Sequence, residues 1–287
     1  MVTNYCQNIT NTYQGYIAGL PITYTSEKEI EGIFDILNYN DVKSEDAELL
    51  KDALIFGVGY EILWVDEDGQ QRFKRLDPRE VIPIYSNTLD EELLYVIRYY
   101  TEQTIDTESE SYIVEVYDFD KVTKYRSNLG FTTFNLLEEV PYYYNQVPIT
   151  VFNLNRDNVS CFDSIISLQD AYNNLLSAEI DDFDAFADAY LILKGVVADS
   201  DDLATMKQNR VLLMDSEDSA EYLTKNISDT QIQNMLQNIN DQIHKMSNSP
   251  DFNDEKLMAQ SGIAMKYKLI GFENVSSAIV ANMTKAL

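Results

Sequence analysis

The stretch 161-CFDSIISLQDAYNNLLSAEIDDFDAFADAYLIL-193 decides how the rest of the chain is organised. It contains neither Gly nor Pro, and Gly195 follows shortly after it. At a rise of 1.5 Å per residue it predicts one helix of roughly 45–50 Å, which is long for a globular chain. Steps of 100° per residue gather a wide apolar band on one face. The residues of this band that we expect to contact a neighbouring subunit are Ile165, Tyr172, Leu176, Phe183, Phe186 and Tyr190.

An acidic stripe runs along another face of the same predicted helix. Carboxylates one turn apart each cost a helix a few tenths of a kcal/mol, so a reason other than helix stability is needed for the stripe. One reading is a solvated back face, and the other is a wall that repels an anion. Glu179 within the apolar band and Asp182 at its edge are candidates for contacts across a subunit interface instead. The stripe consists of Asp163, Asp170, Asp181, Asp184 and Asp188, with Ser177 between them.

The composition excludes several classes of protein. Acidic residues outnumber basic ones 48 to 21, and the formal charge of -27 is the opposite of what a phosphate-gripping surface carries. Two cysteines far apart in a chain of 287 residues give no disulfide framework and fit a reducing cytoplasm. The sequence shows neither a membrane-spanning run nor a signal peptide, and we expect no membrane insertion. The length allows two or three compact units.

The part before the long helix reads as helices followed by strands. Helical spacing covers 3–18, 26–37 and a stretch from Ser44 that closes at Gly57 or Gly59, with a short strand expected at 22–24. From Tyr60 the period changes to that of strands, and Asp68-Gly69 predicts a tight hairpin turn. Short strands continue as a meander up to Leu154. The whole chain is therefore expected to be α+β.

Basic residues gather in this meander although the chain is poor in them elsewhere. One reading is cross-strand pairing with neighbouring Glu and Asp, and the other is contact with a partner or a neighbouring subunit. The cluster consists of Arg72, Lys74, Arg75, Arg79, Arg98, Lys121, Lys124 and Arg126.

The part after the long helix reads as an outgoing and returning pair. A compact acidic insert at 196–227, with a helix near 201–207 and strands near 211–214 and 220–223, precedes a helix at 228–246. A polar loop at 247–256 and a last helix at 257–287 follow. Such a pair projects from a body, and the surplus apolar band of the first helix predicts copies of the same chain beside it, closed into a ring.

Four stretches resemble one known family, the portal proteins of tailed double-stranded-DNA bacteriophages, siphophage type. They are NITNTYQGYIAGLPITYT, the segment from LLKDALIFGVGYEILWV to LLYVIRYY, VPITVFNLN with the long helix, and MAQSGIAMKYKLIGFE. The resemblance implies a mixed α/β wing with antiparallel strands at 1–160, a first stem helix at 161–195 and a small α/β clip at 196–227. It also implies a second stem helix at 228–246, a tunnel loop at 247–256 and a helix returning to the wing at 257–287. Portals extend further at both ends, and we expect the crown that would follow Leu287 to be missing.

The resemblance also implies a function and partners. Portals are rings, usually of twelve subunits, at the capsid vertex of the virion, and double-stranded DNA is packaged and ejected through them without sequence specificity. The terminase motor and the capsid and head-completion proteins dock on them, and assembly takes place in the host cytoplasm. DNA carries about one charge per 1.7 Å, so an acidic stripe facing the bore would let the duplex slide. In the tunnel loop the residues expected nearest the duplex are Asn248, Pro250, Phe252, Asp254, Glu255 and Lys256.

Enzymatic alternatives find little support. The run 181-DDFDAFAD-188 is similar to an aspartate-rich magnesium motif but carries Ala185 in place of the required acid. Gly57-Val-Gly59 lacks a third glycine and precedes a strand, and His244, the one histidine, lies among Asn and Gln. We expect no catalytic residue, no metal and no cofactor. The remaining alternative is a non-channel oligomeric capsid scaffold or adaptor.

Overall fold

The computed structural model describes residues 2–26, 31–101, 111–187, 190–194, 219–223, 229–252 and 262–287. The chain divides into two compact units. The helical unit contains residues 167–243 with the first three residues of the chain, and the body contains 4–166 and 244–287. The body is thus assembled from two segments that the helical unit separates in sequence.

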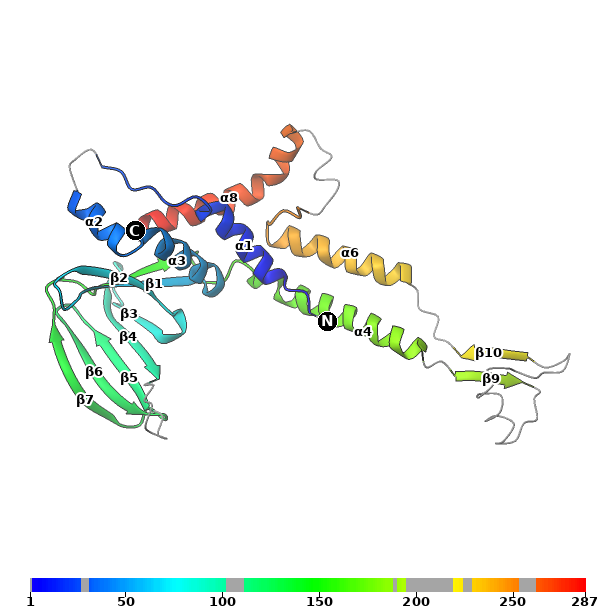
Figure 1. The fold of residues 1–287 in the computed structure, drawn as a ribbon, viewed down its shortest axis with the longest axis horizontal. Coiled ribbons are helices and arrows are strands. Elements are labelled where there is room, and N and C mark those ends of the chain that lie inside the picture. Colours follow the sequence, from blue (N-terminus) through cyan, green and yellow to red (C-terminus); the bar gives the residue numbers. More distant parts are fainter. Residues whose placement is uncertain are drawn as a thin grey trace. The chain divides into compact units, whose positions relative to one another are not determined.

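Helices form one side of the body (Figure 1). The side chain of Asn4 caps the first helix by accepting a bond from Gln7 N, and Ile9 and Tyr13 turn its apolar side into the core. The rings of Tyr13 and Phe272 contact each other at a tilt of 39° with centroids 4.8 Å apart, so that the first and last helices of the body meet. The four helices are α1 (Tyr5–Ala18), α2 (Glu31–Tyr39), α3 (Val42–Phe56) and α8 (Gly262–Ala286).

The strands of the body form two antiparallel sheets rather than one meander. The smaller sheet has the order β2-β1-β8, with β1 (Val58–Val65), β2 (Gln71–Leu76) and β8 (Ile149–Asn153). The tight turn between β1 and β2 holds Gly69 at φ +74°, as the sequence predicts. The larger sheet keeps the chain order of β3 (Val81–Tyr85), β4 (Leu93–Thr101), β5 (Ser111–Tyr117), β6 (Lys121–Asn128) and β7 (Phe134–Pro141), after a 3-10 turn η1 (Pro78–Glu80).

The core of the body lies between these two sheets. Tyr60 and Ile62 of β1 meet Val96 of β4 and Tyr117 of β5 in one buried cluster. Since side chains of a strand alternate between faces, only one face of the five-stranded sheet enters this core. The other face carries apolar side chains such as Ile82 and Phe134 that stay about half exposed.

The long predicted helix is shorter than expected. A 3-10 turn η2 (Asp163–Ile165) opens α4 (Ile166–Ala187), and the chain is a strand again at β9 (Tyr190–Lys194). β9 pairs with β10 (Ser219–Leu223), and the backbone bonds gained from this pairing favour the strand for the apolar run Tyr-Leu-Ile-Leu. An apolar run of that length fits either a buried helix or a strand, which is why periodicity alone misassigned it.

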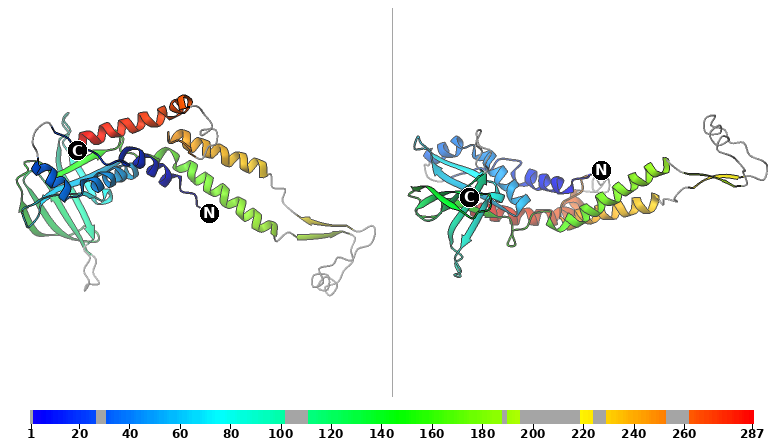
Figure 2. Two further views of the ribbon diagram at one scale, coloured as in Figure 1. Left: turned by 45° about the horizontal axis from the view of Figure 1, so that its top comes forward. Right: turned by 90° about the horizontal axis from the view of Figure 1, so that it is seen from below.

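The second long helix is α6 (Asp229–Met246), and Figures 1 and 2 show it running beside α4 with the β9–β10 pair beyond them. The predicted strand at 220–223 is confirmed within β10, whereas 22–24 is not a strand. The helix expected near 201–207 and the strand near 211–214 lie outside the described residues. Overall the mixture of helices and antiparallel sheets confirms the α+β class. Among the described helices, none combines the length and apolarity that crossing a membrane requires.

Candidate functional site

The acidic stripe can be followed over part of its length. Asp170 and Asp181 are eleven residues apart in α4, which places them within about 20° of each other around the helix, and both are exposed. Asp163 is also exposed but lies in η2, within the body. The backbone of Asp184 is helical, and its side chain lies outside the described part, as does all of Asp188. The visible members thus lie on a water-accessible face, as both readings of the stripe require.

The apolar band of α4 is only partly covered. Tyr172 and Leu176 are partly buried and Ile180 remains 40% exposed, so a neighbour could still bury apolar area on this face. Ile165 is a correction, because it is fully buried within the single chain and cannot contact another subunit. Tyr190 belongs to strand β9 and not to the helix, so its predicted position on the band is wrong. The side chains of Phe183 and Phe186 lie outside the described part.

The N-terminus of the chain is fastened to α4. Thr3 N donates to Asn173 Oδ1 at 2.7 Å, and Asn173 Nδ2 donates back to Thr3 O at 3.1 Å. Both residues belong to the helical unit, while Asn4 already belongs to the body. Sequence reasoning missed this clasp because no local pattern joins residues 170 positions apart.

The start of the predicted tunnel loop is a fixed turn. His244 Nδ1 donates to Ser249 O at 3.1 Å, and its Nε2 lies 3.8 Å from Asp251 Oδ2. Tyr13 OH donates to Ser247 O at 2.9 Å from α1. The one histidine of the chain therefore stabilises this turn through its contacts with Ser249 and Asp251.

The structure describes only the first part of the predicted tunnel loop, which contains Asn248, Pro250 and Phe252. Asn248 is exposed at φ +53°, and its Oδ1 lies so close to Gly271 that a Cβ there would be only 3.0 Å away. Pro250 is partly buried, whereas Phe252 is 57% exposed. Asp254, Glu255 and Lys256 lie outside the described residues. The turn thus fixes the described start of the predicted loop within the body.

The basic residues of the strands are mostly paired within the chain. Lys124 Nζ lies 2.8 Å from Glu138 Oε1 across β6 and β7, and Lys121 Nζ lies 3.0 Å from Glu139 Oε2 on the same pair of strands. Arg75 Nη1 donates at 2.7 Å to Asp52 of α3. This confirms the cross-strand reading for Lys121 and Lys124.

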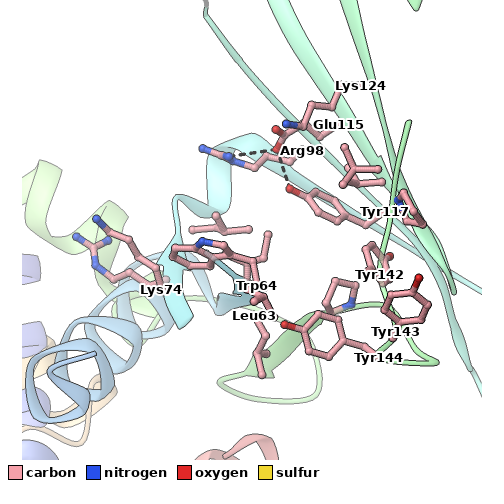
Figure 3. A pocket seen from close by; sticks show the side chains of 18 of the residues that line it. Leu63, Trp64, Lys74, Arg98, Glu115, Tyr117, Lys124, Tyr142, Tyr143 and Tyr144 are labelled. Atoms are coloured by element: carbon pink, nitrogen blue, oxygen red, sulfur yellow. Dashed lines mark hydrogen bonds and ion pairs between the residues drawn. The ribbon is translucent and has the colours of Figure 1, made fainter. Parts of the chain in front are cut away.

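A cavity between the two sheets was not foreseen from the sequence (Figure 3). It has a volume of about 920 Å³, with Trp64 of β1 on one wall and Tyr142 and Tyr144 on another. Buried Glu115 accepts bonds at the third wall from Tyr117 OH at 2.8 Å and Arg98 Nη1 at 3.2 Å. Burial and the adjacent carboxylate raise the pKa of Tyr117, so this hydroxyl stays a donor. The pairing register of distant strands creates the cavity, and no sequence motif marks it.

A second buried carboxylate group lies between α3 and β1. Burial raises the pKa of Glu61 to about 7, and Asp46 and Glu45 of α3 add to the shift. Tyr24 OH donates to Asp46 Oδ2 at 2.7 Å. In the part of the chain that the structure describes, no three His, Cys, Asp or Glu side chains are arranged to hold a metal ion. Because its pKa is raised in the fold, Glu61 makes the stability of the protein depend on pH.

One family model matches the whole chain, and two curated proteins match most of it. The family described as "Phage portal protein, SPP1 Gp6-like" matches residues 1–287. The portal protein of Bacillus phage SPP1 is 22% identical over 84% of this chain, and the portal protein of Clostridium phage phiCD119 is 23% identical over 92% of it. The matched regions cover 51% and 64% of the lengths of these relatives, so the chain spans only part of each. The match over all 287 residues places the chain in the SPP1 Gp6-like family of phage portal proteins.

Proposed function

We propose that this chain is a portal subunit and that copies of it form a ring at the capsid vertex, through which double-stranded DNA is packaged and ejected. The observation that carries the proposal is the family match over residues 1–287. The partly covered apolar band of α4 supports assembly of copies, because Ile180 on this face still exposes apolar surface. A ring needs such unsatisfied surface on each subunit.

The acidic stripe fits the wall of the bore. Asp170 and Asp181 are exposed on one face of α4, and a ring would repeat them around the passage. Exposed charges act over about 8 Å at physiological salt, so a wall of carboxylates would repel phosphates that come close and would not hold them. A cationic wall would instead bind the duplex more tightly with each phosphate contact.

The proposal extends to the parts and partners of the ring. Twelve copies are proposed, with residues 1–160 as the wing, α4 and α6 as the stem, 196–227 as the clip and 247–256 as the tunnel loop. The proposed partners are the terminase motor, the capsid and head-completion proteins and the DNA itself. We propose that the assembled ring belongs to the virion and that no catalytic step belongs to this chain.

Electron microscopy of the purified protein tests the channel. We expect hollow rings whose central hole is wide enough for a B-form duplex. Closed particles of defined size without a central hole would favour the non-channel scaffold instead. Monomers alone over the whole range of protein and salt concentrations tested would contradict assembly altogether.

A further inference from the structure

The two sheets of the body have four outer edges, of which two are covered and a third is interrupted by a proline. At β2, Phe73 N donates to Asn40 Oδ1 at 3.3 Å and Arg75 N donates to Glu45 Oε2 at 3.0 Å, so side chains from the helical layer occupy this edge. At β3, Pro83 has no N–H to offer. At β8, helix α8 packs alongside, and Asn282 Nδ2 donates to Leu154 O just beyond the strand.

The fourth edge, β7, is left open. It ends the five-stranded sheet (Figure 1). All eight of its residues are exposed. Among the described residues no backbone bond joins β7 to anything but β6, although half of the N–H and C=O groups of an edge strand point outward. It contains no lysine and no proline before its last residue. An exposed edge of this length, with unpaired backbone N–H and C=O groups, is a surface on which another strand can pair.

A cavity lies beside β7 on each face of the five-stranded sheet. The register shift opposite Lys124 and Tyr125 turns the two halves of β7 to opposite faces. Val140 and Pro141 therefore border the cavity of about 920 Å³ between the sheets, and Phe134 borders a second hollow of about 680 Å³ on the other face. An added strand would direct alternate side chains toward these two apolar hollows.

The charge of the edge favours a cationic partner. Glu138 and Glu139 each pair with one lysine of β6, yet their side chains remain 52% and 49% exposed. A strand on the open side would lie as close to these carboxylates as β6 does. Because the chain also carries a formal charge of -27, an acidic strand would be repelled and a basic one attracted.

A second copy of this chain fits the edge poorly. Among the described strands of the two body sheets, the other edges are covered or, at β3, interrupted by Pro83, so a copy that pairs body to body would offer its own β7. Such pairing is two-fold, brings both Glu138–Glu139 pairs into one short ladder, and cannot continue around a ring. We propose that the β7 edge docks an extended segment of a different protein, with alternating apolar and basic residues, as a sixth strand of the sheet.

Three labelled peptides test this proposal with the full-length protein. The first alternates lysine and valine over eight residues, the second replaces every lysine with glutamate, and the third has the first sequence with one central valine replaced by proline. We expect saturable binding of the first by fluorescence anisotropy, with the other two at least tenfold weaker. Hydrogen exchange should slow on binding within residues 134–141 and at neither β2 nor β3.

Two matched variants separate edge pairing from bulk charge. Leu136→Lys on β7 should weaken binding of the basic peptide at least fivefold, because cations on an edge strand oppose pairing. Leu89→Lys adds the same charge in the exposed connection between β3 and β4 and should change binding less than twofold. Equal weakening by both variants, or equal binding of the proline peptide, would overturn the proposal. So would a discrete dimer of the protein alone that Leu136→Lys abolishes while the peptide fails to bind.

Discussion

At Gly57 the conformation and packing of the backbone leave no room for any residue other than glycine. Gly57 ends α3 at φ +80°, and its N–H donates to Ala53 O, in the position where helices often end with a left-handed residue. The sequence predicted this helix end at Gly57 or Gly59. It could not predict that a Cβ at Gly57 would lie 2.1 Å from Asn158 O, since that contact comes from a segment 101 positions away in the chain.

Gly57→Ala should therefore destabilise the protein more than Gly69→Ala. Both residues have positive φ, which costs an alanine about 1–2 kcal/mol, but a Cβ at Gly69 would meet open space. Chemical denaturation of the two variants measures the difference. Equal losses would show that the backbone near Asn158 moves aside freely.

Glu61 predicts an unusual dependence of stability on pH. Its folded pKa of about 7 lies above the ordinary value near 4.3, so the native state holds this proton more tightly than the unfolded chain does. The stability due to the protonated carboxyl is present below the unfolded pKa and is lost as pH rises toward and through 7. Asp46 and Glu45 face it from α3, and Arg75 and Thr150 lie opposite it on the flanking strands.

Glu61→Gln should remove this loss. We expect little change in the free energy of unfolding at pH 4 and a gain of up to about 3 kcal/mol at pH 8, because a tenfold difference in proton affinity between the folded and unfolded carboxyl is worth about 1.4 kcal/mol. Urea denaturation of the wild type and of the variant at both pH values measures this change in the free energy of unfolding. Glu67→Gln in the exposed β1–β2 turn is the control, and a parallel gain there would refute the assignment to Glu61.

At the scale of elements, turn and helix-end signals located the hairpin and the end of α3, but no signal in the sequence predicted which distant strands pair. The Asp68-Gly69 pair located the β1–β2 hairpin because the short loop between Asp66 and Gln70 needs one residue with positive φ, which Gly69 supplies. Nothing in the sequence showed that β1 also pairs with β8, with Val58 opposite Asn153, because such contacts depend on the folded backbone. The same limit explains α4, whose end at Ala187 depends on the partner strand β10.

The acidic face of α4 predicts an effect on DNA movement. The double change Asp170→Lys and Asp181→Lys replaces two exposed carboxylates on one face with ammonium groups. If this face lines the bore, packaging should slow because the duplex is held, while assembly is retained. A packaging assay with the motor measures the rate of DNA movement, and electron microscopy shows whether the variant still forms rings.

A control for this experiment comes from the same helical unit. Gln237→Lys and Asp241→Lys alter an exposed pair on α6, where Gln237 Nε2 donates to Asp241 Oδ1 at 2.8 Å. Packaging unchanged in the α4 variant, or slowed equally in the α6 variant, would refute the assignment of the α4 face to the bore.

At the scale of the whole molecule, charge should govern assembly. Copies with a formal charge of -27 repel one another, and the Debye length falls from about 10 Å at 0.1 M salt to about 3 Å at 1 M. We expect the fraction of assembled protein to rise with salt over this range. Sedimentation velocity measures it, and dissociation at high salt would show that ion pairs, rather than apolar contacts, join the copies.

The division into two units has a consequence for the order of synthesis. Residues 244–287 complete a body that began at Asn4, so the ribosome must finish the entire helical unit before Tyr13 can meet Phe272. Until then the apolar side of α1 has no partner from the C-terminal segment. The nascent chain therefore carries an unfinished hydrophobic surface from the synthesis of α1 until residues 244–287 emerge, and a chaperone can bind at this surface.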